Sequence, residues 1–337
     1  MKILVTGSSG FYGSHLIDLL LKETDAEIYG VDNLHRLEDF PVDPFEIIED
    51  KEKFNERFVN WEMDYRDLKA EKIDEVGIDT IIHLAALVSI PESMQKPMEY
   101  FESNEKGTFS LCQELLKTKS KPFLIYASSP EVYGNPVYTP MDTDHPCSPR
   151  SVYAATKLAA EKQCMVLHEW YKYPVSIIRN FNTYGENQSN SYRGYAAVVP
   201  EFVTRAIKDE NIKIHGNGKQ TRDLMYVKDA VEAYVRVMKE REKTQGEVFN
   251  IGTGIQTSIL DLAKKIMDIS GSSSELVYES ERAADLERLE ADYSKTKKLL
   301  KWKPEYNLND LCSDMLESDL KLYGMTLNEA KKIAKKL

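Results

Sequence analysis

The chain has 337 residues, of which 42% are hydrophobic and 29% are charged, and its formal net charge is −11. This length is enough for one large or two modest domains with a substantial core. The acidic balance disfavours nucleic acid and acidic membranes as partners, because no basic surface is available to bind phosphate groups.

The N-terminus and the cysteines bear on the cellular compartment of the protein. Glycines interrupt the apolar N-terminal stretch, and His15 and Asp18 follow it, so we expect neither a signal peptide nor a membrane span. The cysteines show no CxxC spacing and no pairing with histidine; they are Cys112, Cys147, Cys164 and Cys312. We therefore predict reduced thiols, no metal site and a soluble cytoplasmic protein.

Short apolar runs alternate with helical periodicity over the first 180 residues, which is typical of a doubly wound parallel sheet of the Rossmann type. Strands are predicted at 2–6, 27–32, 79–86, 123–129 and 175–182. From residue 181 the sequence becomes polar and rich in turns, with a helix predicted over 226–241, a strand over 247–252 and a Lys-rich helix over 327–337.

This change in composition and pattern at residue 181 predicts two domains. The Rossmann domain covers residues 1–180, with a return segment at about 222–250. A smaller C-terminal α/β domain is formed by residues 181–221 and 251–337. No low-complexity linker separates the two.

A glycine turn follows the first predicted strand. Gly7, Gly10 and Gly13 have the spacing that brings backbone N–H groups close to a pyrophosphate at a helix N-terminus, although a simple strand-to-helix turn gives the same pattern. Asp32 ends the second strand, where an acid accepts the ribose hydroxyls of NAD; a helix cap is its structural alternative. Together they favour NAD, while Arg36 nearby leaves room for NADP.

A tyrosine and a lysine lie one helical turn apart in "YAATK". Tyr153 and Lys157 therefore share one face of a predicted helix. A tyrosine is a poor base at its reference pKa of about 10, and a neighbouring ammonium group improves it. The pattern fits a proton-transfer pair, but it also occurs on ordinary helix surfaces.

Six motifs occur together in an order that resembles the extended short-chain dehydrogenase/reductase family, and within it the NAD-dependent nucleotide-sugar epimerases and dehydratases. They are the glycine turn, "HLAA" (83–86), "SS" before "VYG" (128–134), "YAATKLAAE" (153–161), "RNFNTYG" (179–185) and "GKQTRDLMYV" (218–227). The resemblance runs from residue 3 to about 304 and is greatest to the UDP-glucose 4-epimerases.

The resemblance implies roles for the residues at matching positions. Tyr153 is the expected catalytic base, Lys157 tunes it and holds the nicotinamide ribose, and Ser129 bridges the sugar O4 to Tyr153, which leaves Ser128 structural. Asp64 is the expected acid beside adenine. A tightly bound NAD that is not consumed is expected to contact Gly7, Gly10, Phe11, Tyr12, Gly13, Asp32, Asn33, Asp64, Tyr65, Leu84, Ala85, Ala86, Asn104, Tyr153 and Lys157.

The substrate implied by the resemblance is a nucleoside-diphosphate sugar. Its expected contacts are Ser89, Ser129, Asn182, Arg222 and Arg282. Guanidinium groups suit phosphate oxygens, although each arginine also fits a surface ion pair. The segment "ERAAD" around Arg282 departs from the usual "RPGD", and Ser89 also fits a helix-entry turn.

The stretch "ASSPEVYG" (127–134) bears on which reaction follows. The family's 4,6-dehydratases have a segment similar to "TDEVYG" at this position, with an aspartic acid where this chain has Pro130. Elimination of water is therefore disfavoured, because its acid is missing. Glu131 matches the glutamate of the decarboxylases' "SEVYG". Its structural alternative is a loop acid that only holds a neighbouring residue in position. "AALVSIPESM" and "QTRDLMYVKD" are similar to the epimerase forms. We predict NAD-dependent 4-epimerisation of a UDP-hexose. The alternative is UDP-glucuronate decarboxylation or another nucleotide-sugar oxidoreductase or dehydratase reaction of the same family.

Two other classes of protein share this fold. A non-catalytic NAD(H)-sensing protein is disfavoured because Ser129, Tyr153 and Lys157 are all present, and an RNA-binding or structural role is disfavoured by the acidic charge.

The resemblance also implies a homodimer formed through the Tyr-Lys helix and the helix before it. The apolar faces of 109–116 and 157–167 fit this interface or ordinary packing on the sheet.

Overall fold

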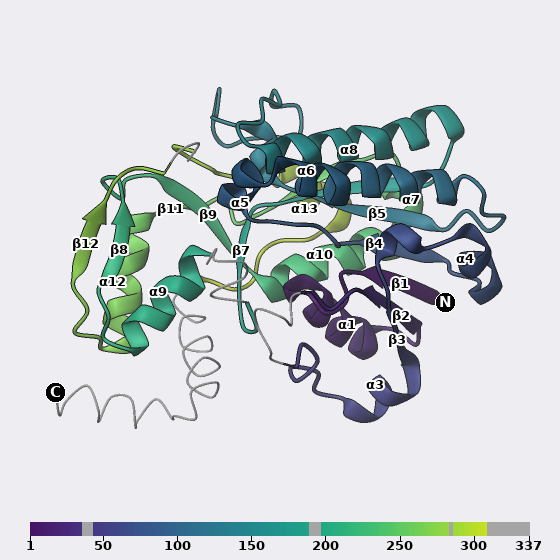
Figure 1. Cartoon of the computed structure of the whole chain (residues 1–337), viewed down its shortest axis with the longest axis horizontal. Helices are drawn as coiled ribbons and strands as arrows, with labels where there is room; N and C mark the ends of the chain where they lie inside the picture. The colour runs from purple at the N-terminus through teal and green to yellow at the C-terminus, as the bar shows by residue number, and fades with distance from the viewer. Residues whose placement is uncertain (36–42, 189–196, 283–285, 309–337) are drawn as a thin grey trace.

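The computed structural model describes residues 1–35, 43–188, 197–282 and 286–308 (Figure 1). The expected helix at 327–337 and Arg36 lie outside this part of the chain. The main sheet has seven strands in the order β10-β6-β5-β4-β1-β2-β3, with every pair parallel. The strands are β1 (Lys2–Thr6), β2 (Glu27–Asp32), β3 (Phe58–Glu62), β4 (Thr80–His83), β5 (Phe123–Ser128), β6 (Val175–Asn180) and β10 (Val248–Ile251).

Helices cover both faces of this sheet, as the alternating pattern predicts (Figure 1). On one face lie α1 (Phe11–Glu23) and α10 (Val227–Lys239), whose buried side chains form a core cluster with Ile3, Val5 and Ile125. On the other lie α7 (Gly107–Leu115) and α8 (Val152–Tyr171), packed on Leu4 and Ile177. The prediction of a doubly wound parallel sheet is confirmed.

Burial explains why the central strands were predictable. Every residue of β4 and β5 is buried, because helices cover both faces there, and a strand buried on both faces is a continuous apolar run. Strand β3 forms the sheet edge and is half exposed. It has no apolar run, and the sequence did not predict it.

Shorter elements connect the strands of the main sheet. They are α3 (Lys51–Arg57), the 3₁₀ turn η1 (Tyr65–Asp67), α4 (Ala70–Val76), α5 (Ile90–Gln95), α6 (Pro97–Tyr100), the π-helix η2 (Phe101–Lys106) and the 3₁₀ turn η3 (Pro130–Tyr133). In the described part of the chain, no helix has both the length and the apolar character needed to cross a membrane.

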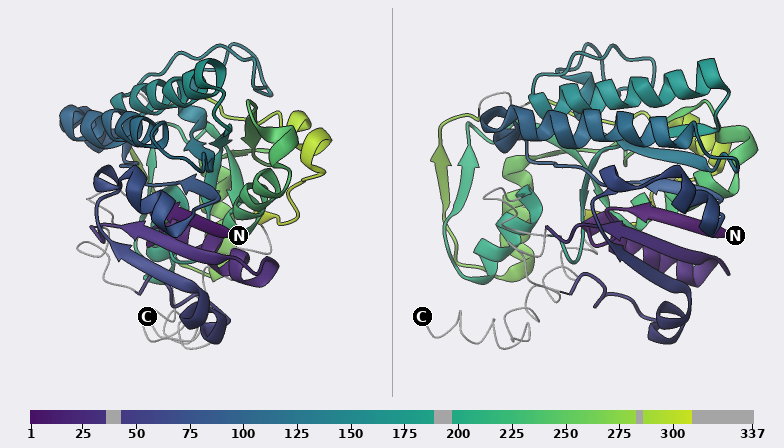
Figure 2. Two further views of the ribbon diagram at one scale, coloured as in Figure 1. Left: turned by 90° about the vertical axis from the view of Figure 1, so that its right-hand side faces the viewer. Right: turned by 45° about the vertical axis from the view of Figure 1, so that its right-hand side comes forward.

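A smaller layer lies beside the main sheet (Figure 2). It contains the three-stranded sheet β11-β9-β7 and the parallel pair β12-β8. Helices α9 and α12 contact each other and β8. Its elements are β7 (Asn182–Tyr184), α9 (Val198–Ile207), β8 (Ile212–His215), β9 (Thr221–Tyr226), β11 (Gln256–Ser258), α12 (Ile259–Ser270) and β12 (Leu276–Glu279).

The chain returns from the smaller layer to the main sheet between residues 227 and 251. Helix α10 packs on α1, the short α11 (Arg241–Thr244) follows, and β10 adds the last strand beside β6. Helix α13 (Ser294–Leu300) contacts both α10 and β10. The predicted return segment at about 222–250 falls on β9, α10, α11 and most of β10.

Candidate active site

A cavity of about 830 Å³ lies at the carboxyl ends of the parallel strands. This edge of an open α/β sheet is where ligands bind, because the loops and helix N-termini that leave the strands converge there. Most of the residues predicted from the sequence line it: Gly7, Gly10, Phe11, Tyr12, Gly13, Asp32, Asn33, Asp64, Tyr65, Leu84, Ala85, Ala86, Ser129, Tyr153, Lys157 and Asn182.

The glycine turn brings two backbone segments into contact. Gly7 has φ +73°, which L side chains rarely adopt, and a Cβ there would lie 2.9 Å from the backbone nitrogen of Ala85. A Cβ on Gly13 would lie 2.1 Å from the carbonyl oxygen of Gly7. Gly10 is the N-cap of α1 and offers no capping side chain. The first N–H groups of α1 are therefore open to an anionic ligand.

Two carboxylates lie at the far end of this cavity. Asp32 accepts hydrogen bonds from the backbone N–H groups of Ser9 (2.9 Å) and Leu34 (2.8 Å), so it also braces the glycine turn. Asp64 accepts two hydrogen bonds from the Arg66 guanidinium, at 2.8 and 2.6 Å. These bonds hold the pKa of Asp64 below its ordinary value. Asp64 is therefore ionised at neutral pH, and hydrogen bonds fix both carboxylates in position.

Asn104, expected on the cofactor side, lies behind the cavity wall. Its side chain donates to the carbonyl of Leu87 and accepts from the N–H of the same residue, each at 2.8 Å. It is buried on η2 and does not line the cavity. Asn104 therefore fixes the backbone that follows Leu84, Ala85 and Ala86.

His83 belongs to the same supporting layer. Its ring lies between Thr6 Oγ1 at 2.6 Å and Thr108 Oγ1 at 3.1 Å, and Thr108 donates to the carbonyl of Asn104. Burial lowers the pKa of His83 to about 3, so the ring is neutral. Since Thr108 already donates elsewhere, this network places the ring proton on Nε2.

Helix α8 presents Tyr153 and Lys157 to the cavity. Ser151 caps this helix by accepting a hydrogen bond from Ala154, and both catalytic candidates lie within its first two turns. Burial lowers the pKa of Lys157 to about 7, and its ammonium nitrogen lies 4.5 Å from the centre of the Tyr126 ring. Lys157 is thus poised between its two protonation states near neutral pH.

Ser129 starts the 3₁₀ turn η3 and lines the cavity. Its hydroxyl accepts a hydrogen bond from the N–H of Glu131 at 3.3 Å, which fits the missing donor at Pro130. Ser128 donates instead to the buried carboxylate of Glu161 at 2.8 Å. The expectation that Ser128 has a structural role agrees with this contact.

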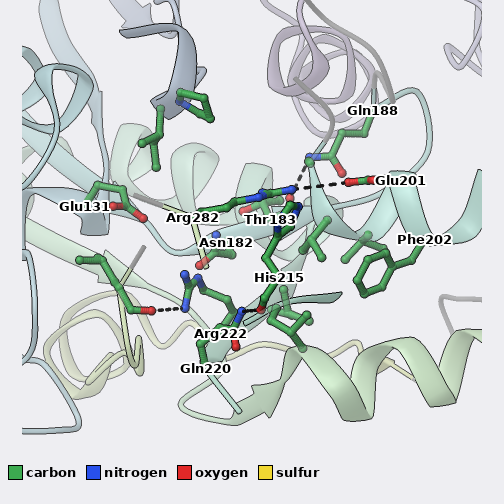
Figure 3. A pocket seen from close by; sticks show the side chains of 18 of the residues that line it. Glu131, Asn182, Thr183, Gln188, Glu201, Phe202, His215, Gln220, Arg222 and Arg282 are labelled. Atoms are coloured by element: carbon green, nitrogen blue, oxygen red, sulfur yellow. Dashed lines mark hydrogen bonds and ion pairs between the residues drawn. The ribbon is translucent and has the colours of Figure 1, made fainter. Parts of the chain in front are cut away.

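A second, smaller pocket of about 140 Å³ adjoins the first and shares Asn182 with it. Glu131, Arg222 and Arg282 line this pocket, and Glu201 lies on its opposite side from Glu131 in the view of Figure 3. Arg222 donates to the carbonyl of Leu286 at 2.8 Å, and Arg282 pairs with Glu201 at 3.8 Å. The sequence-predicted arginines therefore meet at one pocket.

Two basic side chains of this pocket were not predicted. Lys213 and His215 lie on β8, and both line the pocket. Lys213 pairs with Glu279 of the neighbouring β12 at 2.8 Å. From residue 181 the sequence indicates only a polar region rich in turns. The alternation of Ile212 and Ile214 with these two basic residues is the signal that indicates the strand.

Ser89 does not reach either cavity. It is fully buried, caps α5 and accepts a hydrogen bond from the N–H of Glu92 at 3.2 Å. The structure thus places Ser89 as the helix-entry residue that was its structural alternative.

Three buried amide oxygens beside the large cavity have no donor in the described part of the chain. Asn180 Oδ1, Asn182 Oδ1 and Gln188 Oε1 have no hydrogen-bond partner among the described residues. All three residues line the large cavity. A buried acceptor without a donor is costly, so these atoms fit a ligand that supplies amide or hydroxyl donors. Among the described residues, no group of three or more His, Cys, Asp or Glu side chains is placed to hold a metal ion.

The parallel sheet, the glycine turn and the Tyr-Lys helix define a short-chain dehydrogenase/reductase of the extended type. The model of the GDP-mannose 4,6 dehydratase family matches residues 4–315, and the chain belongs to this family of nucleotide-sugar epimerases and dehydratases.

Relatives in this family have different activities. The UDP-glucose 4-epimerase of Mycolicibacterium smegmatis is 32% identical over 308 residues, which cover 91% of this chain and 95% of that protein. The UDP-N-acetyl-alpha-D-glucosaminuronate decarboxylase of Bacillus cytotoxicus is 33% identical over 291 residues, with 82% and 83% covered. The UDP-glucuronic acid 4-epimerase of Bacillus cereus, solved with UDP-glucuronic acid and NAD, matches with TM-score 0.86 and 30% identity, covering 96% of this chain and all of that one.

Proposed function

We propose that this protein is an NAD-dependent 4-epimerase of a nucleoside-diphosphate sugar, with a UDP-hexose as substrate. The observation that carries this proposal is one cavity lined by Ser129, Tyr153 and Lys157, in a chain with Pro130 where a dehydratase needs an acid. Oxidation and reduction at C4 need Ser129, Tyr153 and Lys157. Elimination of water also needs an acidic side chain at position 130, which proline cannot supply.

The cavity has the features that an NAD site requires. The glycine turn leaves no room for side chains beside the N-terminus of α1, and Asp32 stands at the end of β2, where a ribose is recognised. When bound there, NAD would supply reversible hydride transfer at sugar C4 and would not be consumed. The glycine turn would hold its pyrophosphate, and Asp32 its adenosine ribose.

The chain's own side chains move the proton. Tyr153 accepts the proton of the sugar 4-hydroxyl and later gives it back, acting as general base and then as general acid. Ser129 bridges the sugar oxygen and the Tyr153 hydroxyl. The Lys157 ammonium, buried beneath the cavity, stabilises the phenolate by its charge.

The smaller pocket suits the diphosphate. Arg222 and Arg282 bring two guanidinium groups to one wall, and Lys213 and His215 add basic nitrogens. Arg222 is 8% exposed and fixed by carbonyl acceptors, so it is preorganised for phosphate oxygens. Asn182 lines both cavities, which supports a contact with the substrate between its sugar and its diphosphate.

Glu131 separates epimerisation from decarboxylation. It lines the diphosphate pocket and not the larger cavity. For a 4-epimerase, Glu131→Gln leaves kcat within about threefold, because the proton passes between Ser129, Tyr153 and the sugar. For a decarboxylase in which Glu131 acts on the substrate, the same change lowers kcat by roughly 10²-fold or more. The kcat of the variant on its best substrate decides between them.

The experiment that tests the proposal is a product analysis. The purified protein is incubated with UDP-glucose, UDP-N-acetylglucosamine and UDP-glucuronate, with and without added NAD, and the products are identified by mass spectrometry and proton NMR. A new anomeric signal at unchanged mass supports a 4-epimerase. Loss of carbon dioxide assigns the decarboxylase, and loss of water contradicts the role given to Pro130.

The glycine turn gives a test of the cofactor site. Gly13→Ala places a Cβ against the carbonyl oxygen of Gly7, so the turn must open and its N–H groups move away from the pyrophosphate. We expect NAD to bind at least about tenfold more weakly, as measured by calorimetry. Gly271→Ala, at the end of α12 where the added Cβ meets nothing within 4 Å, is the control for a glycine-to-alanine change away from the cavity. Equal NAD affinity in both variants would contradict this placement of the cofactor.

We further propose that the protein is a cytoplasmic homodimer. Leu111, Leu115 and Leu167 pack on the sheet, so these apolar residues of α7 and α8 are used within one chain. Other apolar side chains of the same helices face outward: Phe109, Val166, Trp170 and Tyr171. Helices α7 and α8 contact each other and lie on the same face of the sheet (Figure 1). Exposed apolar side chains on neighbouring helices support an interface there.

Trp170 is the most direct test of this interface. It is 79% exposed near the C-terminal end of α8. Trp170→Glu is expected to weaken the dimer by at least about tenfold, measured by sedimentation equilibrium, because interface tryptophans carry much of the binding energy. Tyr278→Glu, on β12 in the smaller layer, is the matched control and should leave the mass unchanged. If the dimer of the Trp170→Glu variant dissociated no more readily than the wild-type dimer, the interface would not lie at this end of α8.

A further inference from the structure

A fully buried ion pair lies directly behind the candidate active site. Glu161 and Arg179 are 0% and 2% exposed, and the guanidinium donates to both carboxylate oxygens, at 2.6 and 3.0 Å. Glu161 is on α8, two turns after Tyr153 and one turn after Lys157, whereas Arg179 is on β6. Neither residue lines either cavity. The mechanism described above does not use them.

This pair holds both ends of the turn that carries Ser129. Before the turn, Ser128 donates its hydroxyl to Glu161 at 2.8 Å. At the end of the turn, Tyr133 accepts a hydrogen bond from Arg179 at 2.7 Å, and the guanidinium stacks on the Tyr133 ring at 4.6 Å. Register adds to this connection, because Ser128 and Arg179 are direct neighbours across β5 and β6.

The network continues beyond the turn. Tyr133 donates to Asn250 on β10 at 2.6 Å, and Asn250 donates to the carbonyl of Met141 at 2.9 Å. Every side-chain nitrogen and oxygen of the ion pair has at least one hydrogen-bond partner, which is the condition under which a buried pair is tolerated. The turn 129–133 is connected through this network to α8 and to two strands of the sheet.

We propose that Glu161 and Arg179 are positioning residues, which set Ser129 in register with Tyr153 and Lys157 by joining the 128–133 turn to α8. This inference rests on the proposed function, because it concerns the same site. Tyr153, Lys157 and Glu161 lie four residues apart on one face of α8, so the helix that carries the base also carries the anchor for the turn. A proton moving between Ser129 and Tyr153 needs that geometry fixed.

The first test removes the two connections to the turn and keeps the ion pair. Ser128→Ala with Tyr133→Phe deletes two hydroxyl groups but leaves Glu161 and Arg179 paired, so no buried charge loses its partner. The matched control is Thr118→Val with Tyr173→Phe. It deletes a hydroxyl pair, 3.3 Å apart and equally buried, before the amino ends of β5 and β6.

We expect the test variant to lower kcat by roughly 10- to 100-fold with KM for the nucleotide sugar unchanged, since misplaced reacting groups slow chemistry more than binding. The control should keep the wild-type kcat despite a similar fall in Tm. A second variant, Glu161→Met with Arg179→Met, removes both charges together and should show the same division between kcat and KM. Wild-type kcat in both test variants, or an equal loss in the control, would overturn the proposal.

Crystal structures of the same variants give a readout that needs no turnover. In the test variant, Ser129 should move relative to Tyr153 by more than about 0.5 Å while α8 stays in place. An unmoved Ser129 would overturn the positioning role even if kcat fell. If the wild-type protein converts no nucleotide sugar, the proposed function fails, and the crystal structures still decide the positioning role by themselves.

Discussion

Tyr153→Phe is expected to lower kcat for the nucleotide-sugar reaction by roughly 10²- to 10⁴-fold. The substitution removes only the hydroxyl that takes the proton from the sugar. The ring still fills its place at the start of α8, where Tyr153 is 9% exposed. KM should change little, because the diphosphate contacts at Arg222 and Arg282 are intact. Steady-state kinetics on the best substrate provides the measurement.

The control for this prediction is Tyr278→Phe, a tyrosine of β12 that is 57% exposed and lines neither cavity. It should keep wild-type kcat and KM. If Tyr153→Phe retained more than about a tenth of the wild-type kcat, another group would be accepting the proton and the assignment of Tyr153 as base would be wrong.

Lys157→Met is expected to have opposite effects on activity and on stability. Turnover should fall by roughly 10²-fold or more, because the phenolate of Tyr153 loses its neighbouring charge. The protein freed of cofactor should become more stable at neutral pH by about 1–2 kcal/mol, since methionine fills the site without a buried ammonium group. Chemical denaturation of the two proteins measures the difference.

The pH dependence of this gain follows from the pKa of Lys157. Burial lowers it from 10.5 to about 7, so below pH 7 the folded wild-type protein carries a charge that burial disfavours. Between pH 7 and 10.5 the unfolded chain binds that proton more strongly than the folded protein, so wild-type stability rises with pH. The advantage of Lys157→Met should therefore be largest below pH 7 and fade towards pH 10.5. An advantage that grows with pH would contradict the lowered pKa.

Local sequence determined most of the cofactor side of the site. The glycine turn, Asp32 and the Tyr-Lys helix are each encoded within a few residues, and parallel topology then brings them to one edge of the sheet. The same reasoning predicted ligand contacts for Asn104 and Ser89, but neither residue lines a cavity. Both lie in motifs next to the site, but their side chains support the backbone around it.

Long-range pairing explains what the sequence did not predict. Lys213 and His215 reach the smaller pocket on β8, which pairs in parallel with β12, more than sixty residues later. The link between Glu161 and Arg179 joins a helix to a strand, and only the folded chain shows that both contact one turn. Edge strand β3 was missed for a different reason, since half-exposed residues give no continuous apolar run.

The most direct test of the proposed chemistry follows the hydrogen at C4. A UDP-hexose carrying deuterium at C4 is converted by the purified protein, and the product is examined by proton NMR and mass spectrometry. The proposal predicts an epimerised sugar of unchanged mass that keeps the deuterium at C4, because the hydride leaves and returns at one carbon while Tyr153 moves only the hydroxyl proton. Deuterium transferred to C6 with loss of water, or lost to solvent, would contradict it.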